Sequence, residues 1–178
     1  LSTLSKQKPV DLLLPRGYLS WSAMLLLETS EEKYIRKYFY DEDVDYSNDF
    51  MTFGKRFAEA KEKGDAGGDP MLEFAMNVTP NYGKPEHTFN AVLKTPYGNC
   101  TILCKLDDYC EKPPKVVEFK TGKTKWTQAK VQKHGQLHFY SVGIYATVGE
   151  NPDQELWWIE TMNTSAGVRP TGHVEQFV

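Results

Sequence analysis

A carboxylate and an ammonium stand inside an otherwise apolar run at VVEFKTG, residues 116–122. Glu118 and Lys120 are two positions apart, and side chains two apart on a strand point to the same face of a sheet. If that face is interior, both charges leave water, which is unfavourable by several kcal/mol each unless something compensates. The spacing predicts that the two groups neutralise each other or that a cation lies beside them.

Asp107 supplies a second carboxylate near this pair. The turn sequence EKPP lies midway between Asp107 and Glu118, so a hairpin there brings both carboxylates and Lys120 into register. Two adjacent carboxylates repel each other unless a hard cation lies between them, and oxygen ligands of this kind select Mg²⁺ or Mn²⁺. The three residues predict a divalent metal site, and an exposed cross-strand ion network is the alternative.

The charges are unevenly distributed along the chain. A formal net charge of -3 over 178 residues argues against a generally basic nucleic-acid-binding coat. Residues 112–133 nevertheless carry seven lysines and the single acid Glu118, whereas residues 28–49 are mainly acidic. A charge run is most often a solvated face, but this one surrounds the Glu118/Lys120 pair and favours contact with an anion.

The elements that position these residues follow a mixed α/β pattern. Helices are predicted from Ser20 or Ser22 through residue 40 and over 51–63. After a loop at 80–87, three antiparallel strands joined by the turns PYGN and EKPP are predicted, then one helix over 127–149 and a strand over 155–163. We expect one α/β domain with a mixed central sheet, built from a β-meander, a helix and a strand and flanked by helices.

Composition indicates an intracellular, cytoplasmic protein that does not enter a membrane. No apolar run approaches the roughly 18 residues of a membrane-spanning helix, and the N-terminal residues lack the pattern of a signal peptide. Cys100, Cys104 and Cys110 have a spacing that fits neither a zinc ribbon nor a disulfide framework. We expect free thiols that pack on strands.

Three segments, KLDDY, VVEFKTG and QLHFY, resemble in this order the RecB-type branch of the PD-(D/E)XK nuclease superfamily. The family pattern is an Asp after an aliphatic residue, a strand ending in Glu-x-Lys, and a helix bearing Gln-x-x-x-Tyr. The resemblance implies a restriction-endonuclease-like core and a metal-dependent deoxyribonuclease, with exonuclease action in recombination, repair or phage DNA processing. It implies one domain over 1–178, with a helical part at 1–70 and a catalytic core at 86–163.

The resemblance also implies roles for individual residues. Asp107 and Glu118 would hold Mg²⁺ or Mn²⁺ with the backbone carbonyl of Phe119, and Lys120 would orient the attacking water and shield the scissile phosphate. Two residues four apart share a helix face, and the family uses that face to contact the substrate strand. The predicted substrate-binding residues are Gln136, Tyr140, Lys123, Lys125, Lys130 and Lys133.

The chain departs from the family pattern at the helix FGKRFAEAKE. The position of the family's His is Ala58, which cannot bind metal, and Glu62 lies one turn further on the same face, so we predict Glu62 as the substitute ligand. No Cys occupies ETSEEKY or the C-terminal GVRPTGHVEQFV, so no iron–sulfur cluster is expected. His134 and His138 share a helix face but have no evident third ligand for zinc.

Two other functions remain open from the sequence. The main alternative is a non-catalytic nucleic-acid-binding or assembly module on the same fold. A metal enzyme acting on a small substrate is the third reading, although the chain has no Gly-rich phosphate loop. DNA is the expected ligand, and the resemblance implies a recombination partner such as a single-strand annealing protein or a helicase. The sequence leaves open whether cutting is exonucleolytic or endonucleolytic and which strand is preferred. It also leaves open whether one or two metals bind and what the oligomeric state is.

Overall fold

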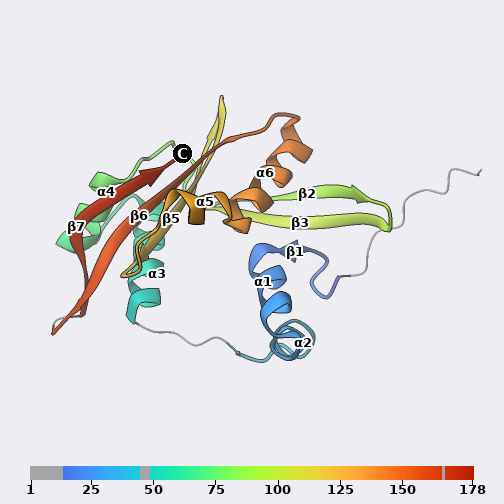
Figure 1. Ribbon diagram of the computed structural model, residues 1–178, viewed down its shortest axis with the longest axis horizontal. Helices are drawn as coiled ribbons and strands as arrows, with labels where there is room; N and C mark the ends of the chain where they lie inside the picture. Colours follow the sequence, from blue (N-terminus) through green and yellow to red (C-terminus); the bar gives the residue numbers. More distant parts are fainter. Residues whose placement is uncertain (1–13, 45–48, 166) are drawn as a thin grey trace, which may run out of the picture.

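The computed structural model describes residues 14–44, 49–165 and 167–178. It is a mixed α/β fold in which two sheets are flanked by helices (Figure 1). Residues 1–13, at the start of the predicted helical part, and residues 45–48, within the mainly acidic segment 28–49, lie outside the described residues. The elements are β1 Leu19–Ser20, α1 Trp21–Thr29, α2 Glu31–Phe39, α3 Asp49–Lys63, α4 Pro70–Val78, β2 His87–Thr95, β3 Gly98–Leu106, β4 Asp108–Glu111, β5 Pro114–Gly122, α5 Gln128–Gln132, α6 Gly135–Val148, β6 Asp153–Thr164 and β7 Gly167–Phe177.

The first sheet has the strand order β1-β3-β2. β2 and β3 form the predicted antiparallel hairpin, with Thr95 opposite Gly98, and β1 pairs in parallel with β3. Alternate residues of β3 are buried, as expected for a strand with one face on the core. α6 packs on this sheet at Gly143, where a Cβ atom would lie 2.5 Å from the Sγ atom of Cys104. A side chain at Gly143 would therefore push the helix away from β3.

The second sheet has the strand order β4-β5-β6-β7. β5 pairs in parallel with β6, and the outer pairs β4-β5 and β6-β7 are antiparallel. Consecutive residues of the central strands are buried, at 116–118 on β5 and at 155–156 and 158–159 on β6, so both faces of these strands are covered. α3 packs against β5 and β7, and its Phe57 contacts Phe119 of β5 edge to face at 5.5 Å between ring centroids. This packing places one face of α3 over β5.

The predicted middle strand of the meander is two strands in two different sheets. β3 ends at Leu106 and β4 begins at Asp108, so the prediction of one meander in one central sheet is wrong. The break falls at Asp107, whose carboxylate accepts a hydrogen bond from the backbone of Phe119 while its carbonyl accepts one from Glu86. These contacts fix the bend where the chain passes from one sheet to the other.

The long helix predicted over 127–149 is also interrupted. α5 ends at Gln132, and α6 begins at Gly135, where a Cβ atom would lie 2.3 Å from the indole of Trp21. The close approach that Gly135 permits is therefore to Trp21. Ser30 divides the first predicted helix, because it ends α1 and its hydroxyl caps α2.

Three elements were not predicted, and the shortest of them is the two-residue strand β1. α4 carries visible start signals, since Asp69 caps the helix and Pro70 occupies its first turn. β7 is an edge strand that contains Pro170 and Gly172, residues that weaken a strand pattern.

The cysteines match their predicted state. Cys100, Cys104 and Cys110 are all free, and burial raises the pKa of the Cys104 thiol to about 12. Within residues 14–44, 49–165 and 167–178, no helix has the length and apolarity needed to cross a membrane.

Candidate active site

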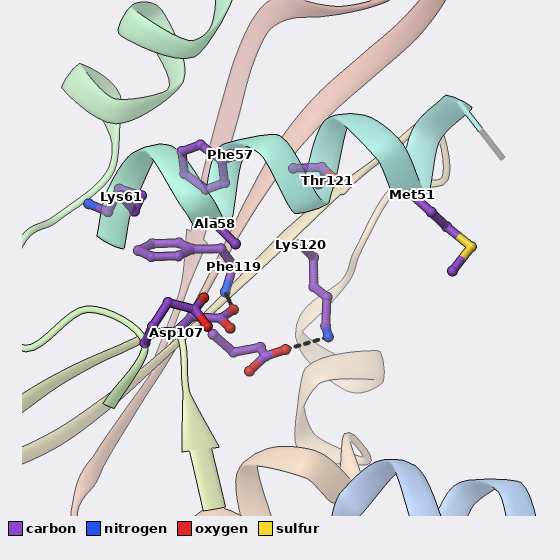
Figure 2. A pocket seen from close by; sticks show the side chains of 11 residues that line it. Met51, Phe57, Ala58, Lys61, Asp107, Phe119, Lys120 and Thr121 are labelled. Atoms are coloured by element: carbon purple, nitrogen blue, oxygen red, sulfur yellow. Dashed lines mark hydrogen bonds and ion pairs between the residues drawn. The ribbon is translucent and has the colours of Figure 1, made fainter. Parts of the chain in front are cut away.

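The candidate site is built around Asp107 and Glu118, which lie side by side. Asp108 is paired with Val117 in the β4-β5 hairpin, so the next position along the hairpin places Asp107 beside Glu118. The Oδ2 atom of Asp107 accepts a hydrogen bond from the backbone nitrogen of Phe119 at 2.6 Å (Figure 2). The hairpin therefore brings together the two carboxylates that the sequence predicts to be neighbours.

Glu118 is buried and only partly satisfied. Its side chain is 3% exposed, and its Oε1 atom accepts a hydrogen bond from the Nζ atom of Lys120 at 2.5 Å. The Oε2 atom is also buried and has no hydrogen-bond partner among the described residues. Burial raises the pKa of Glu118 above its ordinary value, although Lys120 and, more weakly, the side chain of Gln136 oppose that change. The lysine compensates one oxygen of the carboxylate and leaves the other for a further positive group.

The pKa of Asp107 is raised well above its ordinary value. Burial is the main cause, and the negative charge of Glu118 adds to it, whereas the hydrogen bond from Phe119 opposes it. A buried carboxyl whose pKa is raised by a neighbouring buried carboxylate favours a proton or a cation between the two groups. The electrostatics therefore agree with the predicted metal site as well as with a protonated pair.

Glu86 is a third carboxylate at the site, and the sequence analysis did not identify it. It has a left-handed backbone conformation, with φ of 51°, and its backbone nitrogen donates to the carbonyl of Asp107 at 3.1 Å. Its side chain is 8% exposed and forms an ion pair with Lys105. Burial is the main cause of the raised pKa values of Asp107 and Glu118, and the negative charge of Glu86 adds to both. One signal was available, because Glu86 is the single acid in residues 74–106.

These acids open into a pocket of about 390 Å³ between α3 and β5 (Figure 2). Gly54 allows the two elements to lie close, since a Cβ atom there would be 3.0 Å from the Oγ1 atom of Thr121. Ala58 faces the pocket beside Phe119 and Asp107, while the Nζ atom of Lys61 points away and donates to the carbonyl of Pro80 at 2.5 Å. The pocket thus has an apolar wall on α3 and a charged floor on the strands.

Glu62 does not line this pocket. It is exposed, and the residues of α3 that line the pocket are Met51, Gly54, Phe57, Ala58 and Lys61. Sharing a helix side with Ala58 does not suffice, because the lining residue that follows Ala58 on α3 is Lys61 and the adjacent Glu62 is exposed. The carboxylate that does line the pocket, besides Asp107 and Glu118, is that of Glu86 from the loop before β2.

Gln136 and Tyr140 form a hydrogen-bonded chain with Lys120. The Nζ atom of Lys120 donates to the Oε1 atom of Gln136 at 2.9 Å, and the Nε2 atom of Gln136 donates to the hydroxyl of Tyr140 at 2.7 Å. Burial, followed by the charge of Glu118, raises the pKa of Tyr140 above its ordinary value. The predicted shared face is present, and it positions the lysine of the site with a phenol that stays protonated.

The four further lysines lie on the surface that follows β5. All are exposed; Lys125 pairs with Glu175 at 3.5 Å, and Lys130 lies over the ring of Trp126 at 4.0 Å from its centroid. The four are Lys123, Lys125, Lys130 and Lys133. Their exposure leaves them able to contact a polyanion, which is the role the sequence analysis predicts for them.

The two histidines do not form a zinc pair. A ring nitrogen of His138 contacts the carbonyl of Gln132 at 3.0 Å, whereas the ring of His134 packs near Trp21 and Trp126. Burial and nearby Lys120 lower the pKa of His134 to about 4. Across the residues that the structure describes, no group of three or more His, Cys, Asp and Glu side chains is arranged to hold a metal ion.

Comparison with known proteins shows a similar fold. No family model and no curated protein matches the chain. Its structure matches the crystal structure of a Eubacterium rectale protein called "Putative exonuclease", with a TM-score of 0.58, 13% sequence identity, and coverage of 90% of this chain and 73% of that chain. The likeness shows that the two proteins share an α/β fold, in agreement with the restriction-endonuclease-like core expected from the sequence.

Proposed function

We propose that the protein is a metal-dependent deoxyribonuclease that hydrolyses DNA phosphodiester bonds and acts as an exonuclease. The observation that carries this proposal is the buried Asp107–Glu118 pair, in which one oxygen of Glu118 lacks a partner beside Lys120. The fold shared with a protein named as an exonuclease supports the same class of activity. Recombination, repair or phage DNA processing is the proposed setting, with an annealing protein or helicase as partner.

Asp107 and Glu118 are the proposed ligands of Mg²⁺ or Mn²⁺, with the carbonyl of Phe119 and the carboxylate of Glu86 close by. The fit rests on the donor set, because these groups offer only oxygen atoms, which hard divalent cations prefer. The unpartnered oxygen of Glu118 is the group that a bound cation would satisfy. Such a cation, when bound, would lower the pKa of a bound water and would offset negative charge on the phosphate under attack.

Lys120 and its neighbours supply the remaining chemistry. Gln136 and Tyr140 restrict the ammonium to one position, from which it can donate a hydrogen bond to the attacking water or to the scissile phosphate. The rings of Phe57 and Phe119 exclude water from one side of the pocket. Low water content strengthens the interaction of the ammonium with a phosphate oxygen.

A digestion series tests the proposal. Linear, nicked and closed circular DNA are incubated with Mg²⁺, with Mn²⁺ and with EDTA, using wild type and Glu118→Gln. We expect cleavage of linear DNA that needs a divalent cation and is lost in Glu118→Gln. Cleavage of linear but not closed circular DNA supports exonuclease action. Equal cleavage in EDTA, or equal cleavage by the variant, contradicts the proposal.

One observation favours the alternative of a non-catalytic DNA-binding module. Lys120 already pairs with Glu118 at 2.5 Å, so part of the carboxylate charge is neutralised without metal. A module of this kind would bind DNA equally well with and without EDTA and would cut none of the three DNA forms.

A further inference from the structure

A second cleft begins where the candidate active site ends. It shares Lys120 and Gln136 with that site and continues over Trp126, Lys130 and His134. These side chains come from the segment between β5 and α6 that carries the exposed lysines. The cleft therefore combines aromatic rings with positive charge directly beside the proposed point of cleavage.

Trp126 is partly buried against the core, contacts the ring of His134 and is covered on one face by a movable group. The ring of His134 meets it at 80° with 5.0 Å between centroids, which fixes the orientation of the indole. The Nζ atom of Lys130 lies 4.0 Å from the ring centroid, and this lysine is exposed. The side chain of Thr127 caps α5 by accepting from the backbone nitrogen of Lys130. The backbone around the indole is thus fixed while the ammonium can leave the ring.

Trp21 lies between the cleft over Trp126 and a second hollow on the other side of its indole. It lines both the cleft over Trp126 and the hollow that contains Asp107 and Tyr140. It reaches this position because Gly135 has no side chain. Gln136 also borders both spaces. A strand whose phosphate lies at Lys120 would extend to one side of Trp21 into the hollow and to the other side into the cleft.

The charges of the cleft suit a nucleotide. Lys130 and Lys133 are exposed and can contact phosphates, whereas His134 is uncharged at neutral pH because burial and Lys120 lower its pKa to about 4. Aromatic faces bordered by lysines are the arrangement with which proteins bind single strands without reading their sequence. A base inside a duplex cannot use this arrangement, since neighbouring base pairs cover both of its faces.

We propose that this cleft binds an unpaired nucleotide of the DNA strand next to the cleaved phosphate, with its base stacked on Trp126. Lys130 leaves the indole face when the base arrives and contacts a phosphate of the same strand. The inference rests on the proposed nuclease function and specifies its substrate as a DNA end with unpaired nucleotides.

Binding of oligonucleotides in Ca²⁺, chosen to limit cleavage, tests this inference. The probes are a short single-stranded oligothymidylate, the same strand with one abasic position moved along it, and a blunt duplex. We expect Trp126→Ala to bind the single strand about tenfold more weakly, which corresponds to about 1.4 kcal/mol, and Trp126→Phe to restore most of the affinity. For wild type, a strand with the abasic site at one particular position should bind as weakly as the intact strand binds to Trp126→Ala. For Trp126→Ala, the same abasic strand should bind no more weakly than the intact strand.

A matched pair of lysine variants isolates the role of Lys130. Lys130→Ala should reduce the salt dependence of single-strand binding, because one phosphate contact is lost. Lys94→Ala, which changes an exposed lysine on β2, should leave it unchanged.

The outcomes separate this inference from the proposed function. Metal-dependent cleavage by a wild type whose affinity is unchanged at every abasic position overturns the stacking site and leaves the nuclease intact. A wild type that neither binds nor cuts DNA overturns both. Should Trp126→Ala fail to fold, the abasic series on wild type and Trp126→Phe decides, and equal affinity for all strands again rejects the site.

Discussion

Two buried glutamates, each paired with a lysine near one end of β5, differ in how completely they are satisfied. Glu155 accepts hydrogen bonds from Lys115 at 2.7 Å, from the indole of Trp157 at 2.9 Å and from the hydroxyl of Tyr82. Glu118 accepts one from Lys120, and its second oxygen has no described partner. Both residues are at most 4% exposed, so burial alone does not distinguish them.

The pKa shifts of the two carboxyls have opposite directions for this reason. Burial acts to raise both, but the hydrogen bonds from Lys115 and Trp157 outweigh it at Glu155, whose pKa is lowered. At Glu118 burial outweighs Lys120, and the pKa is raised. A buried carboxylate with all its partners stabilises the fold, whereas one that lacks them is unfavourable for the fold and available to a ligand.

The largest expected difference concerns activity. Glu118→Gln should slow DNA cleavage at least about a hundredfold, or about 2.7 kcal/mol in the barrier, because it removes a negatively charged metal ligand. Glu155→Gln should cleave within about twofold of wild type under conditions where it is folded. Initial rates on linear DNA in Mg²⁺ measure both. More than about a tenth of wild-type activity in Glu118→Gln, a change of only 1.36 kcal/mol, would contradict the assignment.

The second prediction reverses the comparison for stability. Glu155→Ala should lower the free energy of unfolding by about 1–3 kcal/mol, since Lys115, Trp157 and Tyr82 lose a shared acceptor. Glu118→Ala, measured in EDTA, should be unchanged or more stable, because it removes a repulsion with Asp107. Urea unfolding of both variants provides the values. A clear loss of stability in Glu118→Ala would make Glu118 a structural partner of Lys120.

The third prediction concerns the chain that holds Lys120. Gln136→Ala should reduce kcat about tenfold, or about 1.4 kcal/mol, with little change in melting temperature, because the ammonium loses a fixed acceptor. Tyr140→Phe should have a smaller effect of the same kind. Gln132→Ala, an exposed position on α5, is the control. Unfolding of Tyr140→Phe would show that this face of α6 is core scaffolding.

The smallest effect is in the pH dependence of stability without metal. The lowered pKa of Glu155 gives stability that is present above the unfolded value, near 4.5, and is lost as the pH falls. The raised pKa of Glu118 stabilises the fold at pH values below the pKa of the unfolded chain. This stabilisation is lost as the pH rises through the higher pKa that Glu118 has in the folded protein. Glu155→Gln should flatten the acid side of the curve.

Glu118→Gln should instead flatten the decline toward neutral pH. Melting temperatures in EDTA from mildly acidic to neutral pH measure both slopes. Identical curves for the two variants would show that the carboxyls have the same environment in solution.

Local patterns account for what could be predicted about the site. The EKPP turn sets the hairpin register, and the register places Asp107 beside Glu118 and Lys120. A spacing of four places Gln136 and Tyr140 on one helix face. Neither prediction needed distant contacts, because hairpin register and helix periodicity are short-range properties.

Contacts between distant segments account for what could not be predicted. The left-handed conformation of Glu86 and its hydrogen bond to Asp107 join two segments separated by a hairpin. Gly135, where α6 begins, packs against Trp21, more than a hundred residues earlier in the chain. Contacts of this kind form only when the sheets and helices pack together.

The sequence by itself determined which groups can do chemistry and which of them are neighbours along a hairpin or a helix, because backbone geometry fixes those neighbours. The tertiary structure alone decided that Asp107 lies at the junction of two sheets, that Glu86 and not Glu62 lines the pocket, and that Glu118 keeps one oxygen unsatisfied. Each of these depends on which distant atoms approach a carboxylate. That approach is set by the packing of α3 and α6 on the strands.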